Sequence, residues 1–481
     1  MRRLSGPDAW FLYSERPTWP MHVGALCILE PCEGAEWGMD QVRTLLAERL
    51  PSVPEFTMKL KEVPLGLDRP LLVRDPDFDI DRHLHRLGVP SPGGPGELAD
   101  LVAMLAETPL DRRRPLWDIW VIEGLAGGRS ALFVKTHHAL VDGVSGVGLA
   151  GILADVEPGG ASGSPPVPIA LAERVPGDLE LLGKGALHAL TSPLFAALWA
   201  VGFIERTVTN VRAARSGGGR TAFNAAPRVP FTGTLGPDRR FAFASVPLEA
   251  VKKAKDLHGV KVNDVVLALA AGAVRRWLAA RGALPAEPVV ASVPMSLRAD
   301  GDEEHGTKLV TLYASLETHI ADPVVRLHAI ADGMESAKGI GNVLKARNIR
   351  RLSDTVIPSL AGLGWRIYQQ SNVESVGLAP SNLVVSNVPG ATVPIYVAGA
   401  RVASAHPVPP LVMGQGLNIT VMSYLDSLDV GFICDWDMIE DPWELVEGFQ
   451  DSLHELVGPR KRARSRPRRD TGPVTRAPVA T

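Results

Sequence analysis

Two glycine-rich stretches interrupt this chain and limit the ways in which it can fold. The first spans residues 157–168 and mixes Gly with Pro and Ser, and the second spans 216–220. Segments of this composition form turns and linkers rather than helices or strands. Residues 1–155 and 226–455 each alternate strand-like and helix-like patterns, and 481 residues are too many for one ordinary core. The sequence therefore predicts two α/β halves of similar size, joined at 156–225 by a linker and a helical crossover.

Hydrophobic periodicity places secondary structure in both halves. We expect strands at residues 23–29, 130–135, 240–246, 289–293, 309–316, 382–388, 418–424 and 429–435, and helices at 39–49, 97–106, 176–214, 248–257 and 262–280. The final segment, 456–481, is rich in Arg and Pro and is expected to be a disordered basic tail. Basic runs of this kind attract anionic lipid surfaces, which is one hypothesis for the tail.

Composition narrows the class of protein. Hydrophobic residues make up 46% and charged residues 21% of the chain, as in globular proteins. The net charge of -3 gives no reason to expect a nucleic-acid partner. The 3 cysteines form no CxxC pair or disulfide framework and the N-terminal residues lack the apolar region of a secretory signal, so we expect a cytoplasmic setting. Pro193 interrupts the apolar stretch at 186–204, which we interpret as a buried or interface-lying helix pair rather than a membrane span.

The residues that carry chemistry follow the strand expected at 130–135. His137 and His138 are adjacent, and Asp142 and Gly143 come four and five residues after the second histidine. A neutral imidazole is well suited to take a proton from an alcohol near pH 7. The nearby acid can hold the local backbone or orient an imidazole, and glycine allows close backbone approach or an unusual backbone angle. This segment therefore predicts a general base at the end of a strand.

Three other interpretations of the same segment were weighed. An isolated pair of histidines commonly has a structural role in which each ring satisfies hydrogen bonds. A metal site is not expected, because a third ligand is not apparent and the spacing is not HExxH. The glycines at 146–151 match GxGxxG, but they begin about ten residues after the strand and a Pro/Gly linker follows them. A dinucleotide site is therefore rejected.

The pattern His137-His138-x-x-x-Asp142-Gly143 resembles the HHxxxDG motif of CoA-dependent acyltransferases of the chloramphenicol acetyltransferase and condensation-domain superfamily. Further motifs resemble those of the wax ester synthase/diacylglycerol acyltransferase family. In chain order these are Leu4-Ser5-Gly6-Pro7-Asp8, Met21-His22-Val23-Gly24, Pro115-Leu116-Trp117, Asn263-Asp264, Val293-Pro294-Met295-Ser296-Leu297-Arg298 and Ser386-Asn387-Val388-Pro389-Gly390. Their joint order is more specific than any single motif. Two positions depart from the family pattern, Ala391 in place of Pro and Thr307 in place of Asn.

This resemblance implies a layered α/β (α+β) fold of two chloramphenicol acetyltransferase-like halves, each a mixed sheet flanked by helices, with an active-site channel between them. It implies a long-chain acyl-CoA as the donor substrate and no cofactor. The acceptor is a diacylglycerol or a fatty alcohol, and the resemblance does not choose between them. Peripheral contact with a membrane or lipid-droplet surface is left open.

We expect direct transfer through a ternary complex, because the chain has no G-x-S-x-G nucleophile motif. His138 is the expected general base on the acceptor hydroxyl, and His137 supports the loop or the substrate. Asp142 is expected to pair with a cation that holds this loop, and Arg298 is the candidate partner.

The tetrahedral intermediate requires hydrogen-bond donors. The candidates are Asn263, the backbone near Gly143 and, more weakly, Ser145. Asn263 fits a helix N-cap equally well. The residues that we expect to line or contact the substrate site are Ser145, Pro115, Trp117, Asp264 and Arg298. For Pro115 and Trp117, packing beneath the channel is the stronger interpretation.

Two alternatives from other classes remain. One is an acyltransferase of the same superfamily that uses an amine or a carrier-bound acceptor, against which the PLW, ND and NVPG motifs argue. The other is a non-catalytic relative that binds acyl-CoA or lipid. The intact His138, Asp142 and Asn263 argue against it, because a binding protein has no need of a general base.

Overall fold

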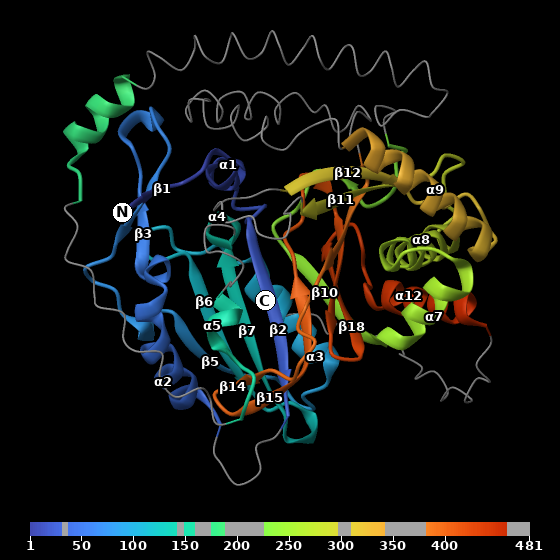
Figure 1. The fold of residues 1–481 in the computed structure, drawn as a ribbon, viewed down its shortest axis with the longest axis horizontal. Coiled ribbons are helices and arrows are strands. Elements are labelled where there is room, and N and C mark those ends of the chain that lie inside the picture. The colour runs from blue at the N-terminus through green and yellow to red at the C-terminus, as the bar shows by residue number, and fades with distance from the viewer. Residues whose placement is uncertain are drawn as a thin grey trace, which may run out of the picture.

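A computed structural model describes residues 1–30, 37–141, 149–158, 175–187, 226–296, 309–341 and 381–458. Two large mixed sheets, each flanked by helices, dominate the fold and lie side by side in Figure 1. This arrangement confirms the expected mixed α/β class with two lobes. We call the lobe that contains the first sheet the N-terminal lobe and the other the C-terminal lobe.

The first sheet has seven strands in the order β5-β6-β7-β2-β15-β14-β8. Their bounds are Leu84–Gly88, Trp117–Glu123, Ser130–His137, His22–Leu29, Ala400–Val408, Tyr396–Val397 and Ala154–Asp155. Two helices cover opposite faces, α2 (Met39–Arg49) and α3 (Pro95–Glu107). Side chains alternate between the faces along each strand, so Phe133 of β7 packs in the cluster that contains α3 while Leu132 packs in the one that contains α2.

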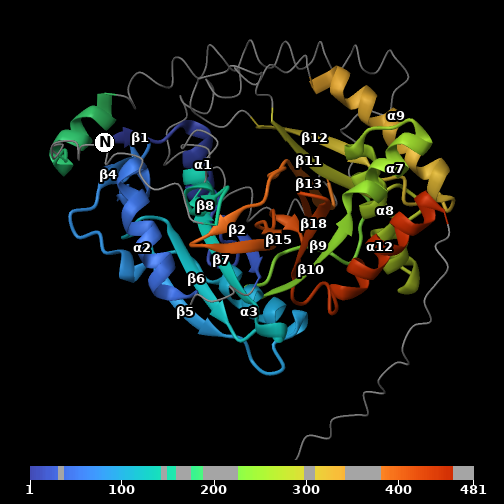
Figure 2. The ribbon, with the colours of Figure 1, turned by 60° about the horizontal axis from the view of Figure 1, so that its bottom comes forward.

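The second sheet has six strands in the order β10-β18-β17-β13-β11-β12. Their bounds are Arg239–Pro247, Ser427–Asp435, Leu417–Tyr424, Leu383–Val388, Val290–Ser296 and Leu309–Ser315. The helices α7 (Leu248–His258), α8 (Val262–Ala280), α9 (Pro323–Gly341) and α12 (Trp443–Val457) lie together on the side away from the N-terminal lobe (Figures 1 and 2). The largest buried hydrophobic cluster fills the space between these helices and the sheet.

Strand β15 connects the two lobes. It comes from late in the chain but pairs antiparallel with β2, with Ala405 opposite Cys27. In Figure 2 the orange β15 lies beside β2, and the late strands β13 and β18 belong to the sheet on its right. A second buried cluster joins Phe133 and α3 to Phe241 and Ile433 of the second sheet, so the lobes share a hydrophobic core.

Two small sheets complete the strands of the described residues. One has the order β1-β4-β3, with bounds Arg2–Arg3, Leu71–Arg74 and Met58–Lys61, and the other pairs β16 (Gly414–Gln415) with β9 (Thr232–Gly233). Residues 178–187 form a helix whose Leu181 packs against Val63 and Leu71 beside the first small sheet.

The expected helices at 39–49 and 262–280 have the observed bounds of α2 and α8. The other expected elements agree within three residues, except the helix expected at 176–214, of which only 178–187 falls among the described residues. The sequence analysis did not identify α1 (Gly6–Ser14), β5, β6, β15, α9 or α12. Of the described helices, none alone is long and apolar enough to cross a membrane, whereas α7 and α8, bent by 103°, meet that requirement as a pair.

A close approach between the two lobes makes one glycine sensitive to substitution. Gly431 of β18 lies against β15, and a Cβ atom there would overlap the backbone carbonyl oxygen of Pro407. Because a backbone atom cannot rotate away as a side chain can, we expect Gly431→Ala to lower the free energy of unfolding by about 3 kcal/mol. Chemical denaturation followed by circular dichroism measures this change.

Gly88→Ala is the matched control, since Gly88 also lies in a strand but a Cβ atom there would meet no atom within 4 Å. This variant is expected to stay within about 0.5 kcal/mol of the parent. Equal stabilities of the two variants would contradict close packing of β15 against β18.

Candidate active site

The two histidines of the HHxxxDG pattern lie where β7 ends and a short helix begins. His137 is the last residue of β7, and His138 is the first residue of α4 (His138–Val141). The backbone N–H of His137 donates to the carbonyl of Leu116 at 2.9 Å, and that of His138 donates to the carbonyl of Met21 at 2.9 Å. The PLW segment and the start of β2 therefore hold the backbone of both histidines.

The ring of His137 is buried, with 1% of the residue exposed. Its Nδ1 accepts the backbone N–H of Ala139 at 3.1 Å, and its Nε2 lies 3.4 Å from Oε1 of Glu15. Across the sheet, His22 pairs with His137 in the strand register, and the two rings meet edge to face at a centroid distance of 5.7 Å. The ring of His137 therefore lies between Ala139, Glu15 and His22.

His138 has different surroundings. The ring of Phe11, in α1, stacks on the imidazole of His138 with a centroid distance of 3.8 Å and an interplanar angle of 18°. His138 is half-buried, in contrast to the buried His137. Of the two histidines, His138 is therefore the more exposed, and its role as the base stays a prediction.

Glu15 was not singled out from the sequence, yet it contacts several parts of this site. It follows α1 as the C-cap residue. Its Oε1 accepts the backbone N–H of Met21 at 3.1 Å, and its Oε2 accepts from Nη2 and Nε of Arg112 at 2.6 and 3.0 Å. Burial by itself would raise the pKa of Glu15, but the contacts with His137 and His22 hold that pKa well below its usual range. Glu15 is consequently an anion near neutral pH.

Two buried bases lie beside this carboxylate. Burial lowers the pKa of His22 to about 4, and the positive charge of Lys135 acts in the same direction. Burial also lowers the pKa of Lys135 to about 8, while its Nζ donates to the carbonyls of Leu105 and Thr108 at the end of α3. At pH 7 the site therefore combines a neutral His22 with a cationic Lys135 and an anionic Glu15.

Trp117 and Pro115 are buried, on the strand next to β7 and just before that strand, respectively. Trp117 is 0% exposed, its Nε1 donates to the carbonyl of Phe56 at 2.7 Å, and its ring stacks on His83 at 4.5 Å. Pro115 is also buried, and its carbonyl accepts the N–H of Trp117. These contacts support the packing interpretation and show no surface of Trp117 that a substrate could contact.

Asn263 and Asp264 open α8, which lies on the outer side of the second sheet in Figure 2. The N-cap is Lys261, whose backbone N–H donates to the carboxylate of Asp264 at 2.9 Å, so the interpretation of Asn263 as the N-cap is wrong. Nδ2 of Asn263 is buried and has no hydrogen-bond partner among the described residues. No described contact brings either side chain to His138, and their predicted roles at the reaction centre stay predictions.

Several expected site residues lie outside the described residues. These are Asp142, Gly143, Ser145 and Arg298, together with the glycines at 146 and 148. The basic tail from residue 459 and the apolar stretch from residue 188 also lie outside them. Within the part of the chain that the structure describes, no group of three or more His, Cys, Asp or Glu side chains is arranged to hold a metal ion.

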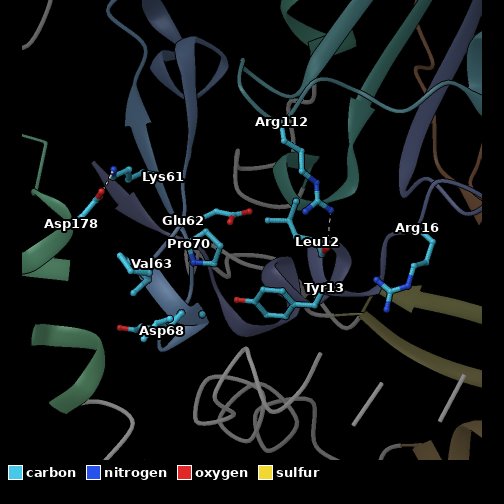
Figure 3. Close-up of a pocket in the computed structure, with 13 residues that line it drawn as sticks. Leu12, Tyr13, Arg16, Lys61, Glu62, Val63, Asp68, Pro70, Arg112 and Asp178 are labelled. Atoms are coloured by element: carbon cyan, nitrogen blue, oxygen red, sulfur yellow. Dashed lines mark hydrogen bonds and ion pairs between the residues drawn. The ribbon is translucent and has the colours of Figure 1, made fainter. Parts of the chain in front are cut away.

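A cavity of about 560 Å³ adjoins α1 on the side where Leu12 and Tyr13 lie. Figure 3 shows Arg112 pointing toward Leu12, to whose carbonyl it donates at 2.7 Å. Arg112 is the same residue that binds Glu15, so one side chain connects the wall of this cavity to the carboxylate beside His137.

Two helix-flanked mixed sheets that share a core, with a half-buried histidine where a strand of one lobe ends, agree with the expected two-lobed acyltransferase fold. The sequence matches the model of the wax ester synthase/diacylglycerol acyltransferase catalytic domain over residues 4–266 and that of the WS/DGAT C-terminal domain over 305–457. The chain therefore belongs to the wax ester synthase/diacylglycerol acyltransferase family and is an acyltransferase.

Individual relatives agree with this assignment. A Mycobacterium tuberculosis (strain CDC 1551 / Oshkosh) protein, provisionally named a diacylglycerol O-acyltransferase, is 37% identical over 95% of this chain and 90% of its own length. A second relative is tgs2 of Mycobacterium tuberculosis (strain ATCC 25618 / H37Rv), which is also provisionally named a diacylglycerol O-acyltransferase. It is 36% identical over 93% of this chain and 97% of its own length.

Solved structures extend the comparison to the fold. The wax ester synthase/diacylglycerol acyltransferase of Marinobacter aquaeolei VT8 has a TM-score of 0.66 and 28% identity, and the alignment covers 94% of this chain and 98% of that one. The starter condensation domain of rhizomide synthetase, in complex with C8-CoA and Leu-SNAC, has a TM-score of 0.53 at 15% identity over 95% and 94% of the two chains. The second likeness concerns the fold alone.

The buried neutral state of His22 predicts how stability depends on pH. Its pKa is about 4 in the folded protein and about 6.5 when unfolded, so the unfolded chain binds a proton first as the pH falls. Stability is therefore expected to fall as the pH decreases through this window, by about 2 kcal/mol between pH 6.5 and 5 from this residue. Denaturation of the parent and His22→Asn at both pH values measures the difference, which is expected to be smaller in the variant.

His454→Asn serves as the control, because His454 is exposed on α12. It is expected to keep the pH dependence of the parent. If His22→Asn also kept that dependence, His22 would not be neutral in the folded protein.

Proposed function

We propose that this protein transfers a long-chain acyl group from acyl-CoA to the hydroxyl of a diacylglycerol, a fatty alcohol or both, with His138 as the general base. One observation carries the proposal. His138 is half-buried, its backbone is held by Met21, and its ring is stacked on Phe11 at the end of a strand, within a chain of the WS/DGAT family. A histidine held in this way can accept a proton from a bound hydroxyl at neutral pH.

The proposed reaction proceeds in one transfer through a tetrahedral intermediate. His138 takes the proton of the acceptor hydroxyl as its oxygen attacks the thioester carbonyl, and a C–O bond forms. The intermediate then collapses, the C–S bond breaks, and the imidazolium returns the proton to the departing thiolate. An ester and free coenzyme A result, no group of the protein is acylated, and the proton balance closes on His138.

The proposal also assigns roles to the other residues expected at the site. Asp142, paired with Arg298, holds the loop that carries His138. The backbone near Gly143 and the hydroxyl of Ser145 supply hydrogen-bond donors to the tetrahedral intermediate. Asn263, in the first turn of α8, is proposed as a further donor, and its Nδ2 is buried with no hydrogen-bond partner among the described residues.

The choice of acceptor and of location also belongs to the proposal. The mycobacterial relatives carry the name of a diacylglycerol O-acyltransferase, and the Marinobacter protein is named for wax esters as well. We favour diacylglycerol on the strength of the higher identity to the former, with fatty alcohol as the second acceptor. A lipid acceptor also favours peripheral contact with a membrane or lipid-droplet surface, to which the basic tail at 459–481 would contribute.

Release of free coenzyme A from palmitoyl-CoA tests the reaction and its base. The parent is expected to release coenzyme A only when dioleoylglycerol or hexadecanol is present, and the better acceptor identifies the activity. His138→Ala is expected to lose about 100-fold or more of this rate, since it removes the general base. The assay follows the free thiol, and thin-layer chromatography identifies the ester.

His85→Ala is the control, because His85 is a partly exposed histidine of the same lobe that contacts Asp118 rather than the site. It is expected to retain the parental rate. Equal rates in the parent and His138→Ala would remove His138 from the mechanism. Acyl-CoA binding without transfer to either acceptor would favour a binding protein instead.

A further inference from the structure

One short helix contacts both histidines of the site. Helix α1 spans Gly6–Ser14, and Phe11, in its last turn but one, stacks on His138 at 3.8 Å. Glu15, which caps the same helix, faces Nε2 of His137 at 3.4 Å. The strand that ends in these histidines lies more than a hundred residues further along the chain, so the contacts are tertiary and depend on where α1 is held.

The contacts of His137 select one tautomer. Because Nδ1 accepts the N–H of Ala139, the neutral imidazole favours the tautomer with its proton on Nε2. Nε2 in turn faces the carboxylate of Glu15, which can only accept. The two neighbours thus agree on the Nε2–H form, and the opposite Nδ1–H tautomer would place a donor against the N–H of Ala139. Ala139 belongs to α4, so the same hydrogen bond fixes the first turn of the helix that His138 opens.

Glu15 is itself held from the other side. Arg112 binds its Oε2 through two nitrogens, at 2.6 and 3.0 Å, and also donates to the carbonyl of Leu12 in the last turn of α1. Met21, whose carbonyl accepts from His138, donates its own N–H to Oε1 of Glu15 at 3.1 Å. A carboxylate with these donors, on a side chain that is only 9% exposed, has little freedom to move.

We propose that Glu15 is a positioning residue for the transfer: by fixing the Nε2–H tautomer of His137 and the end of α1, it sets the place and ring plane of His138. This inference rests on the proposed function for its catalytic consequence. Glu15 acts through His137 and α1 and touches no reacting atom. Because a displacement of about 1 Å at a reacting centre can cost about 100-fold in rate, the effect falls on kcat rather than on substrate affinity.

Three variants separate the contributions of Glu15. Glu15→Ala removes the carboxylate that faces His137, and kcat is expected to fall about 100-fold with KM for palmitoyl-CoA changed by no more than about 2-fold. Glu15→Gln keeps an oxygen that can face Nε2 of His137 but loses the ion pair with Arg112, so kcat is expected to recover to within about 10-fold of the parent. Phe11→Leu removes only the stacking on His138 and is expected to cost about 10-fold in kcat.

Asp118→Ala is the matched control. Asp118 is another poorly exposed acid of the N-terminal lobe that faces two histidines, His83 at 3.6 Å and His85 at 3.3 Å, neither of which belongs to the site. This variant is expected to lower the melting temperature at least as much as Glu15→Ala does, and to keep the parental kcat. A loss of kcat in Asp118→Ala equal to that in Glu15→Ala would mean that general destabilisation explains both, and would overturn the inference.

Histidine-selective 15N NMR gives a readout that needs no turnover. The signals of His137, assigned by their absence in His137→Asn, are expected to show the Nε2–H tautomer in the parent and a mixture of tautomers in Glu15→Ala. An Nδ1–H tautomer in the parent, or the unchanged tautomer together with an unchanged kcat in Glu15→Ala, would overturn the inference. If the parent transferred no acyl group while the tautomer still depended on Glu15, the proposed function would fail and the positioning of His137 would stand.

Discussion

The antiparallel pairing of β2 with its two neighbours is the interaction on which the rest of this structure depends. On one side β2 pairs with β7 and sets His22 opposite His137, and on the other it pairs with β15, which the chain supplies almost four hundred residues later. The end of β7, where the chemistry lies, is therefore fixed only when the late part of the chain has folded onto the early part.

Burial separates the roles of three neighbouring histidines. His22 is neutral because burial and the charge of Lys135 disfavour its protonation, and His137 is enclosed between Ala139 and Glu15. His138 alone is half-buried. A sequence shows two equivalent histidines in a row, whereas the fold buries one of them and leaves the other half-buried. In the proposed mechanism, His138 gains and loses a proton while its ring stays in one position.

Much of the fold could be predicted because it rests on local patterns. The amphipathic period of Met39–Arg49 and the long apolar run of Val262–Ala280 gave helices with the observed bounds. Strand β15 was missed because Ser404, His406 and Pro407 interrupt any strand-like alternation, and it is a strand only because β2 pairs with it. The intrinsic strand propensity of residues does not predict a strand pairing that depends on contacts between distant parts of the chain.

The histidine motif of the site could be predicted from the sequence, but the residues that hold the motif in place could not. The pair of histidines was evident from their spacing, yet Glu15 was not, because Arg112 is 97 residues away and no local pattern connects the two. The sequence allows Asn263 to be a helix N-cap as well as a donor at the reaction centre, but Lys261 is the N-cap of α8 and Asp264 makes the capping hydrogen bond. Roles of this kind depend on tertiary contacts, which a single sequence does not show.

Initial velocities, measured while palmitoyl-CoA and dioleoylglycerol are both varied, test the central claim of direct transfer most directly. Because both substrates must be bound together before His138 can act, the account predicts double-reciprocal lines that intersect. Parallel lines, together with an acylated protein detected by intact mass after incubation with palmitoyl-CoA alone, would reveal a covalent intermediate and contradict the account.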